Sequence, residues 1–235
     1  MREKLNFLRH LSILTLTIII FVIGIFIGNN VEQMRVEKLY TNLQIQDLEY
    51  QNVLTENNYI SYVVGLKEQG EKIDCNVIKG NYYTSISNLD DSRLKLESYI
   101  NNAKVKEDEY ARLKGHYANL QINYWILADR INNICDSNMN PILYFYKDKK
   151  QCPACEDQGT HLSYVKAKLK DNVLIFSFDA EKEGTIKLLN QRYGVNEREL
   201  PVLVIDEKVY GYSSNEEIFN ILCKNGLDNK EVCKN

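Results

Sequence analysis

Two cysteines separated by two residues, Cys152 and Cys155, lie in the segment QCPACE at residues 151–156. This spacing occurs in redox-active pairs, in halves of metal sites and in structural disulfide bonds. We expect a helix to begin here, and a cysteine at a helix N-terminus is stabilised as the thiolate by unpaired backbone N–H groups and by the helix dipole. Cys152 is therefore the candidate nucleophile, and Cys155, one helical turn later, is the candidate resolving thiol.

A structural zinc site would need four ligands. The other candidate ligands near this pair are His161, Cys223 and Cys233, which include no second close pair. We therefore expect no metal site, and exchange through a cysteine pair needs no organic cofactor. Cys223 and Cys233 could instead form a disulfide bond that ties the polar tail, residues 225–235, to the preceding helix; two free thiols are the alternative.

The segments around the cysteine pair alternate between strands and helices, and the order β-α-β-α-β-β-α predicts an α/β domain at residues 140–224. Pro141 ends the helical region that precedes it. We expect, in order, a buried strand at 142–146, a helix beginning at the cysteines, a strand at 172–180, a helix at about 182–193, a hairpin that turns at Asp206 and Glu207, and a capped final helix in SSNEEIFNILCKN.

With the cysteine pair at the start of its first helix, this domain resembles the thioredoxin superfamily. The segment YFYKDKKQCPAC looks like the first strand and redox motif of that superfamily, and YGVNERELPVLVI looks like its loop with a cis-proline ahead of the third strand. The resemblance covers about residues 141–224, under half of the chain. It implies a thioredoxin-like fold, with a central mixed sheet flanked by helices, and protein thiol-disulfide oxidoreductase activity.

The resemblance also implies roles for residues near the cysteines. The peptide bond before Pro201 would be cis, and the backbone of Leu200 would lie beside the active-site sulfurs and pair with an extended substrate. Within the motif, Pro153 suits the first turn of a helix because its missing N–H has no partner to lose there. Ala154 carries no charge or hydrogen-bond donor that could tune the pair.

The sequence departs from thioredoxins proper at two places. Gln151 stands where they carry a tryptophan before the first cysteine, and Tyr144 stands where they carry a buried acid on the first strand. A buried proton acceptor for Cys155 is therefore not evident, and the sequence leaves the direction of electron flow open.

Residues 11–28 include the charge-free run LSILTLTIIIFVIGIFI, which approaches the ~20 residues that cross a bilayer core. We predict an uncleaved transmembrane anchor after a cytoplasmic N-terminus at residues 1–10. A buried soluble helix and a cleaved secretion signal are the alternatives; β-branched residues argue against the first, and no A-x-A-like site supports the second. Flanking cations favour this orientation, with Arg2, Lys4 and Arg9 before the run and Arg35 and Lys38 after it.

Residues 31–138 predict a helical stalk or bundle with two seams of alternating steps of three and four residues. The first seam is Val36, Leu39, Leu43, Gln46, Tyr50, Val53, Asn57, Ile60 and Val64, and the second is Tyr110, Leu113, Tyr117, Leu120, Tyr124, Leu127, Ile131 and Ile134. The amides make the first seam imperfect, and we interpret the tyrosines of the second as packing contacts. The seams could close within one chain or against a second copy, which would make a homodimer.

Turn signals divide the helical region into three helices that run out, back and out again. We expect a turn at residues 65–80, which contain three glycines, then a helix from the cap-type residues at 87–91 to about Ala103, and a break at 104–109. This arrangement places Cys75 and Cys135 at the same end of the bundle, where they could form a disulfide bond. Two free buried thiols are the alternative.

The charge of −3 is near neutral, and the cations are scattered among acids, so we expect no nucleic-acid partner. All six cysteines follow the apolar run, which suits an oxidising compartment. These features predict a single-pass cell-membrane protein whose extracytoplasmic domain exchanges disulfides with protein substrates and with a further redox partner. The alternative is a redox-inert scaffold with a structural Cys152–Cys155 bond and a helical partner-binding region.

Overall fold

The computed structural model describes residues 2–102, 107–148, 150–181 and 184–233. The chain divides into two compact units, Met1–Ile45 and Gln46–Asn235. The long helix α1 (Arg2–Glu68) begins in the first unit and ends in the second. Its segment Ile13–Lys38 is long and apolar enough to cross a membrane, and none of that apolar stretch is buried within the protein. A signal sequence near the N-terminus would have the same properties, so the anchor and its orientation stay predictions.

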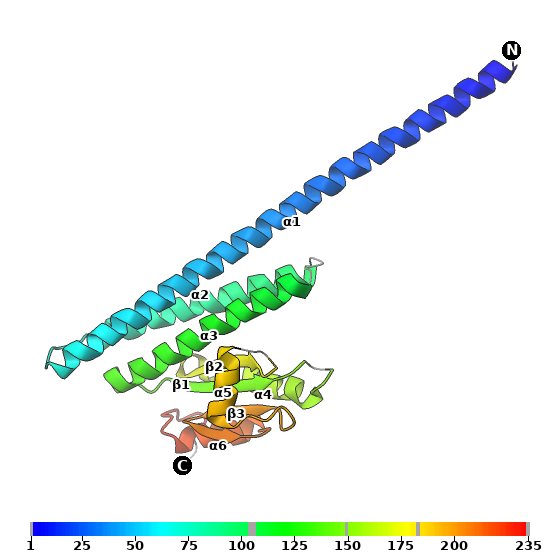
Figure 1. Cartoon of the computed structure of the whole chain (residues 1–235). Helices are drawn as coiled ribbons and strands as arrows, with labels where there is room; N and C mark the ends of the chain where they lie inside the picture. Colours follow the sequence, from blue (N-terminus) through cyan, green and yellow to red (C-terminus); the bar gives the residue numbers. More distant parts are fainter. Residues whose placement is uncertain (1, 103–106, 149, 182–183, 234–235) are drawn as a thin grey trace. The chain divides into compact units, whose positions relative to one another are not determined.

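The second unit begins with a bundle of three helices, formed by the end of α1, by α2 (Cys75–Asn102) and by α3 (Glu107–Cys135). The predicted break at residues 104–109 falls in part on residues 103–106, which lie outside the described part, while residues 107–109 belong to α3. Figure 1 shows α2 and α3 side by side.

The prediction for residues 65–80 is wrong in extent. The turn is short, with Gly70 at a positive φ of 87°, and α2 begins at Cys75 instead of near residue 87. Asp74 starts the helix, because its carboxylate accepts hydrogen bonds from the backbone N–H groups of Asn76 and Val77. Gly80 lies inside α2, where a helix tolerates glycine at a cost of about 1 kcal/mol relative to alanine.

The core of the bundle follows the predicted seams. In the first seam Val53, Asn57 and Ile60 are buried, whereas Val36, in the other unit, is exposed. The described side chains of the second seam are buried or pack against the core; they are Tyr117, Leu120, Tyr124, Leu127, Ile131 and Ile134. The side chains of Tyr110 and Leu113 lie outside the described part.

The rest of the unit is an α/β arrangement in the predicted order. Its elements are β1 (Asn140–Tyr146), α4 (Pro153–Leu169), the 3₁₀ turn η1 (Lys170–Asn172), β2 (Val173–Asp179), α5 (Thr185–Tyr193), β3 (Val202–Ile205), β4 (Lys208–Tyr210) and α6 (Asn215–Lys224). The described sheet is mixed, with the strand order β2-β1-β3-β4. β1 pairs in parallel with β2 and antiparallel with β3, and β3 pairs antiparallel with β4, so the predicted central mixed sheet is confirmed.

Local chemistry explains these connections. The parallel pair β1 and β2 needs a crossover, which α4 supplies. The β3–β4 hairpin turns at Asp206 and Glu207, whose φ angles of 52° and 59° are those of the turn that matches strand twist. Ser214 and Glu217 form a reciprocal capping box at the start of α6.

Two apolar layers enclose the sheet. One face, which includes Ile142 and Leu203, packs against α4 and α6. The opposite face, which includes Phe145 and Phe178, shares a continuous core with α5 and with the helical bundle. The carboxyl end of β1 is therefore held from both sides, and the cysteine pair follows directly after it.

Candidate redox site

The cysteine pair lies at the start of α4, after a tight loop that follows β1. The carbonyl oxygen of Asp148 accepts hydrogen bonds from the N–H groups of Gln151 (2.9 Å) and Cys152 (3.0 Å). Cys152 is the N-cap residue of α4 and Pro153 occupies the first turn, as the sequence predicted for this proline. Cys152 and Cys155 are joined in a disulfide bond.

The two sulfurs differ in their surroundings. Cys155 is 3% exposed and Cys152 is 8% exposed, so Cys152 is the more accessible residue of the pair. Pro153 and Ala154, between them, are exposed and bring no polar side chain to the pair. These positions suit Cys152 for attack and Cys155 for resolution.

The segment before β3 lies against the attacking sulfur. The carbonyl oxygen of Leu200 is 3.6 Å from the Cys152 Sγ atom, and the Leu200–Pro201 peptide bond is cis. Leu200 is partly buried, whereas Pro201 is buried. The structure thus brings together the four residues for which the sequence predicts attack, resolution and substrate docking.

Tyr144, on β1, contacts the backbone of Cys155. Its hydroxyl donates a hydrogen bond to the carbonyl oxygen of Cys155, and its ring stacks on Tyr146. Burial raises the pKa of Tyr144, with a smaller contribution from Tyr146, so the hydroxyl stays protonated. At this position the chain therefore places a neutral donor that holds the first turn of α4, instead of an acid that could accept a proton from Cys155.

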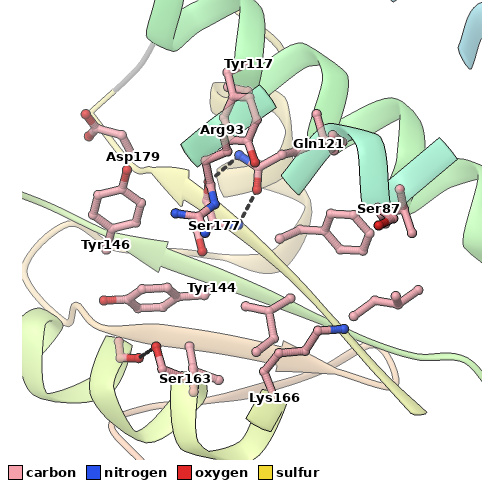
Figure 2. A pocket seen from close by; sticks show the side chains of 18 of the residues that line it. Ser87, Arg93, Tyr117, Gln121, Tyr144, Tyr146, Ser163, Lys166, Ser177 and Asp179 are labelled. Atoms are coloured by element: carbon pink, nitrogen blue, oxygen red, sulfur yellow. Dashed lines mark hydrogen bonds between the residues drawn. The ribbon is translucent and has the colours of Figure 1, made fainter. Parts of the chain in front are cut away.

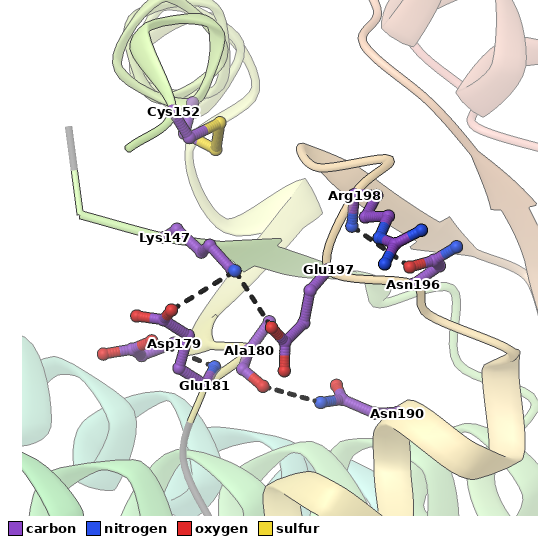
Figure 3. A network of polar contacts seen from close by, with 10 residues as sticks. Lys147, Cys152, Asp179, Ala180, Glu181, Asn190, Asn196, Glu197 and Arg198 are labelled. Atoms are coloured by element: carbon purple, nitrogen blue, oxygen red, sulfur yellow. Dashed lines mark hydrogen bonds and ion pairs between the residues drawn. A yellow bond between two sulfur atoms is a disulfide. The ribbon is translucent and has the colours of Figure 1, made fainter. Parts of the chain in front are cut away.

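Lys147 links the end of β1 to the loop that carries Leu200. Its ammonium group contacts the carboxylates of Glu197 (2.9 Å) and Glu181 (3.2 Å), as Figure 3 shows. The hydrogen bond to Glu197 is the main cause that raises the pKa of Lys147. Because Glu197 lies three residues before Leu200, we interpret Lys147 as a positioning residue for the docking segment.

A buried glutamine, Gln158, anchors α4 about one turn after Cys155. Gln158 is fully buried and exchanges two hydrogen bonds with the backbone of Ser213: its amide group donates to the carbonyl oxygen (2.9 Å), and its carbonyl oxygen accepts from the N–H group (2.8 Å). This clasp joins α4 to the segment that starts α6, and it therefore holds the cysteine-bearing turn in place.

The other four cysteines are also paired. Cys75 is bonded to Cys135 at one end of the bundle, and Cys223 is bonded to Cys233, which joins α6 to the C-terminal tail. All six cysteines lie in the described part, and none is free. Among the described residues, no three histidine, cysteine or acidic side chains are grouped in a way that could hold a metal ion.

Sequence reasoning missed Tyr144 as a donor, Lys147 as a link and Gln158 as a clasp. Each acts through a partner in another element of the fold, which for Lys147 and Gln158 is about fifty residues away, so no local motif marks its role. Gln158 follows Cys155 by about one helical turn, so its side chain should face the core. A polar side chain at such a position was the only sign in the sequence of its role.

No family model and no curated protein matches the chain. Among solved structures, the chain is similar to thioredoxin-2 of a malaria parasite, described as a component of that parasite's protein secretion machinery (19% identity, 37% of this chain, 84% of that chain, TM-score 0.31). It is also similar to the germline-specific thioredoxin Deadhead of Drosophila melanogaster (18% identity, 44% and 92%, TM-score 0.32). A third is the first thioredoxin domain of mouse protein disulfide-isomerase A4 (17% identity, 46% and 80%, TM-score 0.29). At these identities and TM-scores, no activity or partner follows from the likenesses.

Proposed function

We propose that the chain is a membrane-anchored, extracytoplasmic thiol-disulfide oxidoreductase that acts on protein substrates. The observation that supports this most is the geometry of Cys152: it caps the N-terminus of α4, is bonded to Cys155 and lies beside the Leu200 carbonyl oxygen. A structural disulfide generally closes a longer loop than the three residues of sequence separation between these cysteines.

The exchange takes place in two steps. A partner thiolate attacks the Cys152 sulfur, the Cys152–Cys155 bond breaks, and its electron pair leaves on the Cys155 sulfur as a thiolate, which then takes up a proton. A second thiolate of the partner then attacks the partner sulfur that is bonded to Cys152. The bond between that sulfur and Cys152 breaks, and Cys152 leaves as a thiolate. Two partner thiols have then become one disulfide, and the protein pair has gained two electrons. The same steps in reverse reduce a partner disulfide.

The unpaired N–H groups and the dipole of α4 stabilise the Cys152 thiolate whenever it forms. The nearest acids on the helix, Glu156 and Asp157, are exposed, so solvent screens their charge. The backbone of Leu200 supplies the edge on which an extended partner segment would lie during exchange.

Thiol trapping tests the proposal. In the full chain, Cys155→Ser removes the resolving thiol, so mixed disulfides with partners should accumulate through Cys152, and Cys152→Ser is the matched control that should trap nothing. If Cys155→Ser accumulates no mixed disulfide, and the unmodified chain neither oxidises nor reduces a model dithiol, the cysteine pair is structural and the scaffold alternative holds.

The proposed anchor rests on the charge-free run in α1 and on the cysteines that follow it. Membrane-impermeant labelling of a tag at the C-terminus should modify it in intact cells, while a tag at residue 1 is protected. Loss of the N-terminal tag from the mature protein would show cleavage and contradict the anchor.

A further inference from the structure

A glutamine of the helical bundle closes part of the open edge of the sheet. β2 is an edge strand in the described sheet, because only β1 pairs with it. Gln121, on α3, donates from its amide group to the carbonyl oxygen of Ser177 (3.1 Å) and accepts from the Ser177 N–H group (2.9 Å), as Figure 2 shows. Gln121 is 6% exposed, and its side chain makes the two bonds that a neighbouring strand would make.

The same geometry identifies which backbone groups of β2 face outward. Ser177 bonds away from β1, and strand residues alternate in direction, so Ile175 and Val173 also direct their backbone groups away from β1. The Val173 carbonyl oxygen accepts a hydrogen bond from the Lys166 ammonium group (2.9 Å). Ile175, between these two capped positions, has no hydrogen-bond partner for its outward N–H and C=O groups among the described residues.

Ile175 lies in the wall of a cleft of about 800 Å³. Its walls come from α4 on one side, with Leu162 and Ser163, and from α2 and α3 on the other, with Ile86 and Tyr117 (Figure 2). Both walls offer apolar surface, and the volume is within the range of about 300–1,000 Å³ of sites that hold small ligands. An unpaired donor and acceptor on one residue, between two apolar walls, match the backbone of an extended peptide and the side chains that alternate along it.

We propose that this cleft binds an extended polypeptide segment that pairs with the backbone of Ile175, and that the segment belongs to the proteins whose cysteines react at Cys152. The second clause rests on the proposed oxidoreductase function. Tyr144 connects the two places, because its ring lines the cleft and its hydroxyl holds Cys155. At the rim of the cleft, Lys114 pairs with Asp179 (2.6 Å) and Lys166 donates to the carbonyl oxygens of Lys170 and Val173.

The first experiment tests strand pairing with a cysteine-free peptide, acetyl-Glu-Val-Thr-Val-Thr-amide, and the full chain in detergent micelles. Only alternate N–H groups of an extended peptide can face Ile175. Two N-methylated peptides are compared, one methylated at positions 2 and 4 and the other at positions 1, 3 and 5. One of them should bind about tenfold more weakly or worse, because a hydrogen bond is lost and its partner stays desolvated, and the other should bind within about threefold of the unmodified peptide. Hydrogen exchange at the Ile175 amide should slow when the unmodified peptide binds. Equal effects of the two sets, or no binding at millimolar peptide, would overturn the proposal.

The second experiment places the peptide in the cleft. Ser163 is exposed on α4 and lines the cleft, so Ser163→Trp should fill it and weaken peptide binding about tenfold or more. Tyr164 is the next residue, is 47% exposed and does not line the cleft, so Tyr164→Trp is the matched control and should bind as the unmodified chain does. Equal binding by the two variants would contradict the site.

A third measurement links the cleft to exchange. The third experiment uses a peptide with the same five residues, a flexible linker and a dithiol. Docking in the cleft raises the effective concentration of the dithiol at the Cys152–Cys155 bond, so this peptide should reduce the bond at least about fivefold more slowly in Ser163→Trp than in Tyr164→Trp. Dithiothreitol should reduce both variants at one rate. If dithiothreitol leaves the Cys152–Cys155 bond intact, the oxidoreductase proposal fails, and binding of the cysteine-free peptide still tests the cleft separately. If both variants react equally with the linked peptide, the cleft does not contribute to exchange.

Discussion

The bond between Cys75 and Cys135 should contribute more to stability than the bond between Cys223 and Cys233. A disulfide bond stabilises mainly by restricting the unfolded chain, and its contribution grows with the logarithm of the loop that it closes. The sequence separations are 60 and 10 residues. The chain-entropy relation then gives about 4.3 kcal/mol for the bundle bond and about 2.7 kcal/mol for the tail bond, a difference of about 1.6 kcal/mol.

The test compares two double variants in which both cysteines of one pair are replaced by serine. Urea unfolding of the full chain in detergent, followed by the fluorescence of Trp125, should give the lower free energy of unfolding to the variant without Cys75–Cys135. Trp125 is a suitable probe because it is the chain's only tryptophan, is 9% exposed and packs in the core that the bundle shares with the sheet. Similar losses in the two variants, or a larger loss in the Cys223–Cys233 variant, would refute the reasoning from loop length. Labelling of Cys75 by a thiol reagent in the folded, unreduced protein would refute the bond itself.

Two further predictions concern stability. Gln158→Ala removes two hydrogen bonds and leaves two backbone groups of Ser213 without partners, so it should lower the free energy of unfolding by about 2–4 kcal/mol in urea denaturation, and a loss below about 1 kcal/mol would contradict the clasp. Burial lowers the pKa of His116, against an opposing contribution from Asp47. The pKa of His116 is therefore lower in the folded chain than in the unfolded chain. The contribution of the neutral imidazole to the free energy of unfolding is fully present above about pH 6.5 and is lost as the pH falls through the folded pKa. Unfolding measured at about pH 7.5 and pH 5.5 should show this loss, and His116→Gln should reduce it; an unchanged pH dependence in the variant would exclude His116 as its source.

The order of the elements around the cysteine pair could be predicted because its signals are local. The cysteines at a helix start, the turn at Asp206 and Glu207, and the capping box at Ser214 each act within a few residues. The sequence predicts that Pro141 ends the helical region, but Pro141 instead lies inside β1, and α3 ends earlier, at Cys135. The β1–β2 and β3–β4 pairings also follow from one parallel crossover and one hairpin, whereas the antiparallel pairing of β1 with β3 does not.

The start of α2 could not be predicted in the same way. Three glycines suggested a long turn, but the carboxylate of Asp74 caps the helix, and burial of Ile78 and Tyr82 stabilises the turns that follow. Packing against α3 overrides the weak local preference of a glycine within a helix.

The polar contacts of the site were also beyond the sequence. Gln121, Lys147 and Gln158 each contact residues some fifty positions away, at Ser177, Glu197 and Ser213. Only the packing of the sheet against its helices brings these partners together, and a polar side chain gives no local sign of which distant backbone group it will meet.

The reduction potential of the Cys152–Cys155 couple tests the proposed function most directly. The full chain would be equilibrated with glutathione buffers, and the alkylated fraction of each cysteine followed by mass spectrometry. We predict one reversible two-electron transition at Cys152 and Cys155, with about 30 mV per tenfold change in ratio, between about −270 and −120 mV, the span of thioredoxin and its relatives. The other two pairs should remain oxidised under the same conditions. A Cys152–Cys155 bond that stays oxidised throughout, or opens only together with Cys75–Cys135 and Cys223–Cys233, would contradict an exchange site.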